Sequence, residues 1–258
     1  MNNPFPGARL KLDRAKRHIT ELDFAISEFL KENPHGIEIK TDGQGHLRVT
    51  AKMSEASTVG LSVIIGDAIH NLRSSLDHLA AGLIEMNDGT PGRNTAFPID
   101  AAESGFNGNI TSKLAGAADV AIAIVRAMKP YDTGNDGRPG NLNLVSLSRL
   151  DNDDKHLLLL ASVAVARIGR ILIKNPDGSV FLEMTDTEIG GNGDVNVLSV
   201  ALADGMKVEA SRQATFTIRF NGTSRFNGER VPETLRVLAK EVEKVIERFE
   251  VTLFPRIG

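Results

Sequence analysis

Three segments of the chain repeat apolar residues at alternating spacings of three and four, the pattern of a helix that packs in a bundle. The first runs from Ala8 to Asn33, the second from Thr58 to Asn87, and the third starts near Pro232. In the first and third helices, the apolar positions are Leu12, Ala15, Ile19, Leu22, Ile26 and Phe29, then Leu235, Leu238, Val242, Val245 and Phe249. The shared pattern predicts three long helices in one bundle.

Two other regions alternate with a period of two, which is typical of strands that bury one face. Ile37 to Met53 contains the Gly-rich turn Asp42 to Gly45, so it predicts a β-hairpin, and we expect its apolar face to lie against the helices. Residues from about 163 to 222 alternate between repeated turn signals such as Asn175 to Gly178, which predicts an antiparallel sheet late in the chain.

The remaining segments give weaker patterns. Ile110 to Met128 predicts one helix, and Lys129 to Gly140 predicts a polar loop that serves as a lid or a linker. Leu142 to Leu160 predicts a helix that contains Asp151 to His156. Short acidic and amide residues are poor helix formers, so this stretch is the second place to look for function.

These elements predict a single α+β domain over residues 1–258. The helical core occupies about 8–160 and 231–254, the β-hairpin 36–53 and the antiparallel sheet about 163–222. A chain of 258 residues is long enough for one such domain.

Composition narrows the classes of function. The net charge of −3 excludes a non-specific polyanion binder, so a nucleic-acid site would need a local basic patch. Lys11, Arg14, Lys16 and Arg17 form either such a patch or a solvated face. The absence of cysteine removes thiolate chemistry and fits a cytoplasmic protein. No apolar run reaches the length of a membrane span, so we expect no membrane partner.

The central helix, Thr58 to Asn87, carries most of the candidate chemistry. At about 100° per residue, its core seam is Ile65, Ala68, Ile69, Leu72, Leu76, Leu79 and Leu83. The polar side carries Asp67, His70, Ser74, Asp77 and His78, with Asn71 at one edge and Arg73 at the other. Small titratable groups flanked by apolar turns indicate a partly buried site or a hydrogen-bonded subunit interface.

A purely structural interpretation pairs these side chains with one another. Asp67 would pair with Asn71 and Ser74 with His78, as contacts one turn apart. His70 and Asp77 would form a satisfied buried pair that holds two helices in register. On this hypothesis, the protein is a non-enzymatic oligomerising or binding protein.

A second interpretation is a metal-dependent helical-bundle enzyme. Asp67 with His70, and Asp153 with His156, both have the Asp-x-x-His spacing, which places a carboxylate and an imidazole one helical turn apart. Glu21 and Glu241 would be the further carboxylate donors.

Asp154 links the two candidate regions. It shares a helical face with Leu147 and Leu150, so we expect it to point inward. A buried carboxylate needs a partner, and Arg73, His70 or His78 are the candidates. Asp154, with Lys155 and His156, should therefore meet the central helix.

The third interpretation rests on a resemblance. Arg73-Ser-Ser-Leu-Asp-His78 is similar to the Arg-x4-His motif of the HEPN superfamily, many of whose members are metal-independent RNA endonucleases. The resemblance implies that His78 is the general acid or base and that Arg73 stabilises the phosphorane charge, usually at a dimer interface. RNA would be the partner, the protein a homo-oligomer, and no cofactor would be needed. On an ideal helix Arg73 and His78 lie about 140° apart, so the substrate would have to wrap the helix.

The candidate site combines the residues of these interpretations. The candidate catalytic residues are Arg73, His78, His70 and Asp77, and the supporting ones are Asp67, Asn71, Ser74, Asp154, Lys155 and His156. Longer stretches, from Ile65 to Leu79, Phe97 to Ile99 and Asp154 to His156, resemble a family of uncharacterised bacterial and phage proteins. That second resemblance implies no activity, so the three interpretations stay open.

Overall fold

The structure is a computed structural model that describes residues 5–32, 36–52, 58–156, 161–187, 194–211, 214–222 and 225–254, without the side chains of His156, Val165 and Ala166. The helices are α1 (Pro6–Glu32), α2 (Val59–Glu85), α3 (Glu103–Lys113), α4 (Asp119–Ala127), α5 (Leu142–His156) and α6 (Val231–Leu253). The strands are β1 (Gly36–Thr41), β2 (His46–Lys52), β3 (Asp100–Ala102), β4 (Tyr131–Thr133), β5 (Ala161–Ile168), β6 (Ile171–Lys174), β7 (Val180–Met184), β8 (Val195–Ala201), β9 (Lys207–Ala210) and β10 (Ala214–Phe220). The chain has the predicted α+β fold class, with the N-terminal hairpin and the C-terminal helix in place.

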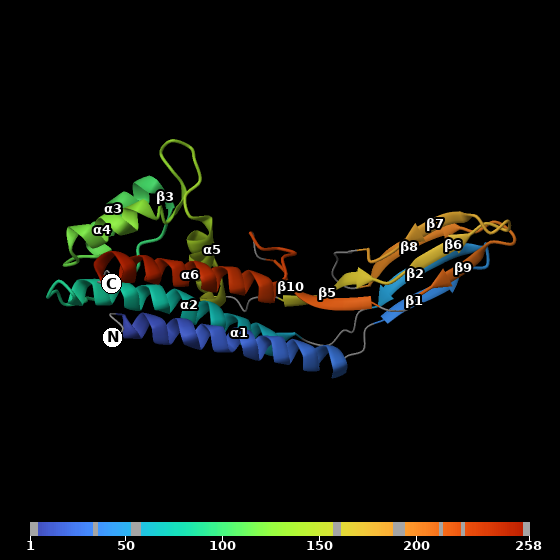
Figure 1. Ribbon diagram of the computed structural model, residues 1–258, viewed down its shortest axis with the longest axis horizontal. Coiled ribbons are helices and arrows are strands. Elements are labelled where there is room, and N and C mark those ends of the chain that lie inside the picture. The colour runs from blue at the N-terminus through green and yellow to red at the C-terminus, as the bar shows by residue number, and fades with distance from the viewer. Residues whose placement is uncertain are drawn as a thin grey trace. The chain divides into compact units, whose positions relative to one another are not determined.

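The contacts divide the chain into two compact units (Figure 1). One comprises Met1–Leu22, Ser62–Leu159 and Pro232–Gly258, and is mainly helical. The other comprises Asp23–Leu61 and Leu160–Val231 and holds most of the strands. The prediction of one domain, in the sense of one independently folding body, stays a prediction.

The helical unit is built on α1, α2 and α6, which lie side by side in Figure 1. The buried hydroxyl of Ser75 in α2 donates to the carbonyl of Ala8 in α1 at 2.7 Å. The ring of Phe5, next to the start of α1, packs edge-on against Phe249 of α6, with centroids 6.4 Å apart. The predicted core seams of α2 and α6 are buried, as is that of α1 as far as Leu22.

The region between α2 and α5 corrects one prediction. Ile110 to Met128 is not a single helix, because α3 ends at Lys113 and α4 begins at Asp119. Gly116 in the turn between them has φ of 94°, a left-handed conformation that favours glycine and interrupts a helix. Part of the predicted loop 129–140 is strand β4, which pairs in parallel with β3.

The second unit corrects the prediction of a single late sheet. Its strands pair antiparallel, as predicted, but they form three groups: β1-β2-β8, β7-β6-β9 and β10-β5. Strand β8 leaves the other late strands and extends the N-terminal hairpin, with Leu47 paired to Val200.

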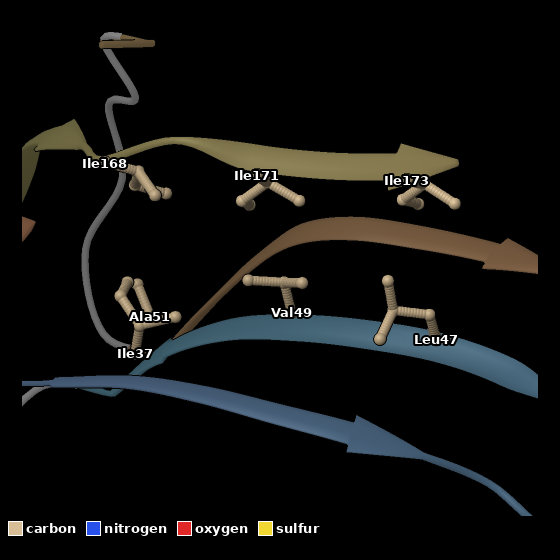
Figure 2. Close-up of a cluster of buried hydrophobic side chains, with 7 residues drawn as sticks. All are labelled: Ile37, Leu47, Val49, Ala51, Ile168, Ile171 and Ile173. Carbon is tan, nitrogen blue, oxygen red and sulfur yellow. The ribbon is translucent and has the colours of Figure 1, made fainter. Parts of the chain in front are cut away.

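The apolar face of the hairpin packs on strands rather than on helices, contrary to expectation. Figure 2 shows the side chains of β2 turned toward those of β6. The buried cluster that they form consists of Ile37, Leu47, Val49, Ala51, Ile168, Ile171 and Ile173. Alternation predicted that one face of the hairpin is buried, but the covering layer comes from residues far along the chain.

Candidate functional site

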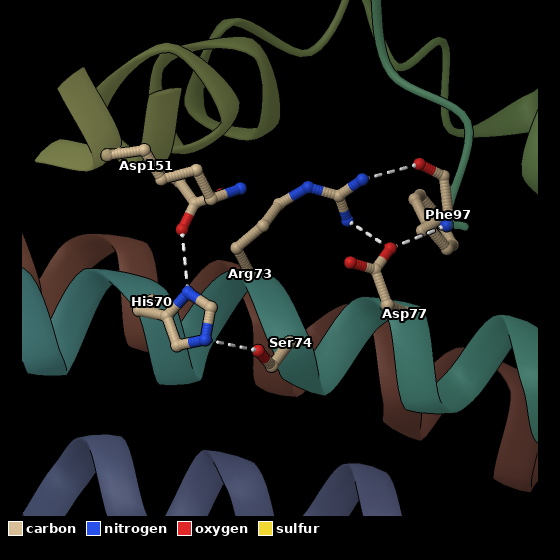
Figure 3. Close-up of polar contacts among 7 residues, drawn as sticks. His70, Arg73, Ser74, Asp77, Phe97 and Asp151 are labelled. Carbon is tan, nitrogen blue, oxygen red and sulfur yellow. Dashed lines mark hydrogen bonds and ion pairs between the residues drawn. The ribbon is translucent and has the colours of Figure 1, made fainter. Parts of the chain in front are cut away.

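The polar side of α2 meets α5 at a histidine–aspartate pair. His70 Nδ1 lies 3.1 Å from Oδ1 of Asp151 (Figure 3). The Asp151 side chain is 4% exposed, whereas that of His70 is 54% exposed. An ionised carboxylate can only accept hydrogen bonds, so the proton of the imidazole is on Nδ1 and Nε2 is left as an acceptor. The buried acid thus fixes both the orientation and the tautomer of an accessible imidazole.

Two further side chains complete this cluster. Ser74, one turn after His70, places its Oγ 3.4 Å from Nε2, on the side of the ring opposite Asp151 (Figure 3). Lys155 Nζ lies 2.5 Å from Oδ2, the second carboxylate oxygen of Asp151, and its side chain is half-exposed. The cluster of His70, Ser74, Asp151 and Lys155, hereafter the His70 cluster, therefore combines an oriented base, a hydroxyl and a cation.

Arg73 and Asp77 face a different part of the molecule. Arg73 Nη2 donates to the carbonyl of Phe97 at 3.0 Å, and the amide of Phe97 donates to Asp77 Oδ1 at 2.9 Å. Arg73 Nη1 and Asp77 Oδ1 are themselves 2.7 Å apart. The two side chains hold both backbone groups of one residue, much as a neighbouring strand would, and Phe97 is fully buried (Figure 3). We call this arrangement the Phe97 clamp.

Of the predicted pairs within α2, Asp67 and Asn71 do make contact, whereas the other two pairs have different partners. Asn71 donates to the backbone carbonyl of Asp67 at 2.8 Å rather than to its carboxylate. Ser74 contacts His70 instead of His78, and Asp77 pairs with Arg73 instead of His70. His70 and Asp77 also take partners from α5 and from residue 97, which a single helix does not contain.

Asp154 meets the central helix as predicted, but at a glycine. A Cβ atom on Gly66 would lie 2.5 Å from both carboxylate oxygens of Asp154, so the missing side chain makes room for the acid. The predicted partnership with His70 belongs instead to Asp151, three residues earlier on α5. His78 is exposed, and its Nδ1 would lie 2.9 Å from a Cβ on Gly7 at the start of α1.

The proposed metal ligands whose side chains the structure describes do not converge. In the parts of the chain that the structure describes, no three His, Asp or Glu side chains are placed to hold a metal ion. Glu21 bonds to His18, and Glu241 accepts a hydrogen bond from Asn141. Asp153 is exposed, and the side chain of His156 lies outside the described residues.

Sequence reasoning missed Asp151 as the partner of His70, although the signal was present. Leu147, Asp151 and Asp154 recur at spacings of four and three, so the pattern that turned Asp154 inward applies to Asp151 as well. The two acids differ in solvent exposure, because Asp151 is buried and Asp154 is only partly buried.

Compared with known proteins, the chain matches no family model, no curated protein and no solved structure. Among the described helices, none combines the length and the apolar character that a bilayer crossing requires. The His70 cluster, with its oriented imidazole, hydroxyl and cation, is the basis of the function proposed below.

Proposed function

We propose that the protein is a cytoplasmic RNA endonuclease that needs no metal ion, as the HEPN resemblance implies, but that its general base is His70 rather than the His78 of the HEPN-like motif. The observation that carries the proposal is the pair of a buried Asp151 and an accessible His70, joined at 3.1 Å. In this reaction, the 2′-hydroxyl attacks the adjacent phosphorus and the bond to the 5′-oxygen breaks. A base must take the proton of the hydroxyl, and a cation must meet the charge that develops on the phosphate.

His70 suits the role of base because one nitrogen is fixed and the other is accessible. The carboxylate of Asp151 holds Nδ1, which orients Nε2 and stabilises the imidazolium that forms on proton uptake. His78, the base that the HEPN resemblance implies, is exposed and lies against Gly7. We therefore assign the base to His70 and keep His78 as the competing assignment.

Lys155 suits the role of cation better than Arg73. Among the described residues, its half-exposed ammonium contacts Asp151 Oδ2, and it would have to leave only that carboxylate to meet a phosphate at Nε2 of His70. Arg73 is 12% exposed and already holds Asp77 and the carbonyl of Phe97. To reach a phosphate, its guanidinium would have to give up both contacts.

The first half of α1 offers a path for the rest of the RNA. Gly7 lies against His78, and Lys11 and Arg14 follow Gly7 at spacings of four and three, on one stripe of α1. Arg9 and Lys16 are paired with acids of α6, whereas within the described residues Lys11 and Arg14 form no ion pair. These two side chains can bind phosphates without losing a partner.

The test is cleavage of a fluorescent single-stranded RNA by purified protein in excess chelator. We expect cleavage that leaves a 2′,3′-cyclic phosphate, and a loss of about 100-fold or more in His70→Ala, the usual share of a general base. His46→Ala is the matched control, because His46 also faces an aspartate, Asp42, at 3.5 Å but lies in the other unit. Circular dichroism must show that the variants fold.

Three outcomes would overturn the proposal in different ways. If the wild-type protein leaves RNA uncut, the assigned activity is wrong. If His70→Ala cuts as well as the wild type while His78→Ala does not, the base is His78. If cleavage disappears with chelator and returns with a divalent cation, the reaction is metal-dependent and the metal-independent mechanism is wrong.

A non-enzymatic binding protein is the second candidate, and the Phe97 clamp favours it. That clamp and the bond from Ser75 to Ala8 use polar residues of α2 to join helices and loops. If this role extends to the His70 cluster, Asp151→Asn lowers stability and wild-type protein neither cuts RNA nor binds it.

A further inference from the structure

We propose that Ser74, His70 and Asp151 form a nucleophile, base and orienting acid that act on carboxylic esters. This activity does not depend on the cleavage of RNA. The three groups form one continuous array: Ser74 Oγ is 3.4 Å from His70 Nε2, and His70 Nδ1 is 3.1 Å from Asp151 Oδ1. Such an order of contacts defines an activated serine on unrelated folds.

The Ser74 hydroxyl contacts a different kind of group from the hydroxyls of Ser146 and Thr20. Ser146 in α5 donates to the carbonyl of Leu142 at 2.6 Å, and Thr20 in α1 donates to that of Lys16 at 3.1 Å. This bond to the carbonyl four residues earlier is the usual arrangement within a helix. Ser74 instead contacts the side chain of the residue four positions earlier, which is His70.

The contacts assign the protons of this array for an ionised Asp151 and a neutral His70. The bond to Asp151 places the imidazole proton on Nδ1, so Nε2 is an acceptor and the hydroxyl of Ser74 is the donor. The hydroxyl proton thus already points at the base that has to remove it.

The reaction balances without a co-reactant other than water. Oγ of Ser74 bonds to the carbonyl carbon of the ester as its proton passes to Nε2 of His70. The bond from that carbon to the leaving oxygen breaks, and His70 returns the proton to the leaving alcohol. Water, deprotonated by the same nitrogen, then bonds to the acyl carbon, the bond from that carbon to Oγ breaks, and His70 returns the proton to Oγ, which releases the acid and restores the hydroxyl.

The developing negative charge on the carbonyl oxygen needs a donor or cation. Lys155 is held on Asp151, across the imidazole from Ser74, so its half-exposed side chain would have to leave that carboxylate to supply the charge. The imidazole is itself 54% exposed, so the array is open to an extended substrate. Esters with a good leaving group, such as aryl esters, are the class that so open a site can turn over.

The test uses a fluorophosphonate probe on the full-length protein, followed by intact mass and peptide mapping. Oγ replaces fluoride on phosphorus, so we expect one adduct, on Ser74. His70→Ala should slow labelling about 100-fold or more and Asp151→Asn at least about tenfold, because each loses the base or its orientation. Ser112→Ala is the matched control, since Ser112 is a helical serine that donates to the carbonyl of Asn109 and should leave labelling unchanged.

A second variant tests the same array with a more reactive nucleophile, in case the fluorophosphonate reacts slowly. Ser74→Cys should react with iodoacetamide faster in the presence of His70 than in the double variant with His70→Ala, because a paired imidazole favours the thiolate. Equal rates in those two proteins, or an unlabelled Ser74 in folded wild-type protein, would overturn the proposal. Loss of RNA cleavage with labelling intact would leave this inference standing, because the two readouts are separate.

Discussion

Replacing Asp77 by alanine tests the Phe97 clamp and, with it, the role of Arg73. Oδ1 of Asp77 accepts the amide hydrogen bond of Phe97 at 2.9 Å and lies 2.7 Å from Nη1 of Arg73. Alanine removes both contacts and inserts nothing. Phe97 keeps its bond from Arg73 at the carbonyl, so the effect is confined to one side of the clamp.

The expected loss of stability in Asp77→Ala depends on how deeply each group of the clamp is buried. A buried amide without a partner costs about 1–3 kcal/mol, and Phe97 is fully buried. The ion pair adds only about 0.5–1 kcal/mol, because Asp77 is 38% exposed and solvent screens its charge. We therefore expect Asp77→Ala to lower the free energy of unfolding by about 2–4 kcal/mol.

Urea unfolding of the helical unit measures this change. The protein has no tryptophan and one tyrosine, Tyr131. That residue is buried in the same unit, with its ring 5.7 Å from that of Phe106, so its near-ultraviolet signal reports on this unit. Asp67→Ala is the matched control, because Asp67 is an exposed aspartate on the same helix.

The clamp would be refuted if the free energies of unfolding of Asp77→Ala and Asp67→Ala differed by less than about 0.5 kcal/mol, the usual range of surface changes. A double-mutant cycle with Arg73→Met sharpens the result, since residues in contact couple by about 0.5–3 kcal/mol. Absence of coupling would mean that Arg73 and Asp77 do not act together as one clamp.

Three further predictions concern other parts of the molecule. Gly66→Ala should destabilise the contact between α2 and α5, because its Cβ would lie 2.5 Å from the carboxylate of Asp154. This loss should outweigh the better helix propensity of alanine, which is worth about 1 kcal/mol. The double variant with Asp154→Ala should regain stability against urea. Val49→Ala should cost about 2 kcal/mol, measured by loss of hydrogen-exchange protection in β2, because Val49 is fully buried in the cluster between the sheets. Hydrogen bonds from the amides of His46 and Gln44 lower the pKa of Asp42, so its contribution to hairpin stability is present above its ordinary pKa and is lost as the pH falls.

Each of these has a result that would contradict it. Gly66→Ala that is more stable than wild type would mean that the carboxylate of Asp154 moves aside freely. If hydrogen exchange in β2 were unchanged in Val49→Ala, the buried cluster between the sheets would not be what protects this strand. In Asp42→Asn, the stability of the hairpin should depend less on acidic pH. If the pH profile of the hairpin's amide signals were unchanged in this variant, other groups would cause the loss of stability in acid.

Much of the fold could be predicted because its determinants are local. The seams of α2 and α6 are buried as their spacing indicates, since side chains three and four apart in a helix must share a face. The hairpin closes at Gly45, which has φ of 79°, a conformation that glycine adopts at little cost. Helix breaks such as Gly116 were less visible, because one glycine within an apolar pattern does not by itself end a helix.

The sequence by itself determined the fold class, the buried faces of the helices and the helix that carries the candidate site. Only the tertiary structure decided the partners: Asp151 for His70, Phe97 for Arg73, and β8 for β2. The reason is physical, because periodicity fixes the direction in which a side chain points, whereas a hydrogen bond needs a second atom near 3 Å. Packing between segments far apart in sequence brings that atom into place. In the His70 cluster it is Oδ1 of Asp151, which orients the imidazole of His70.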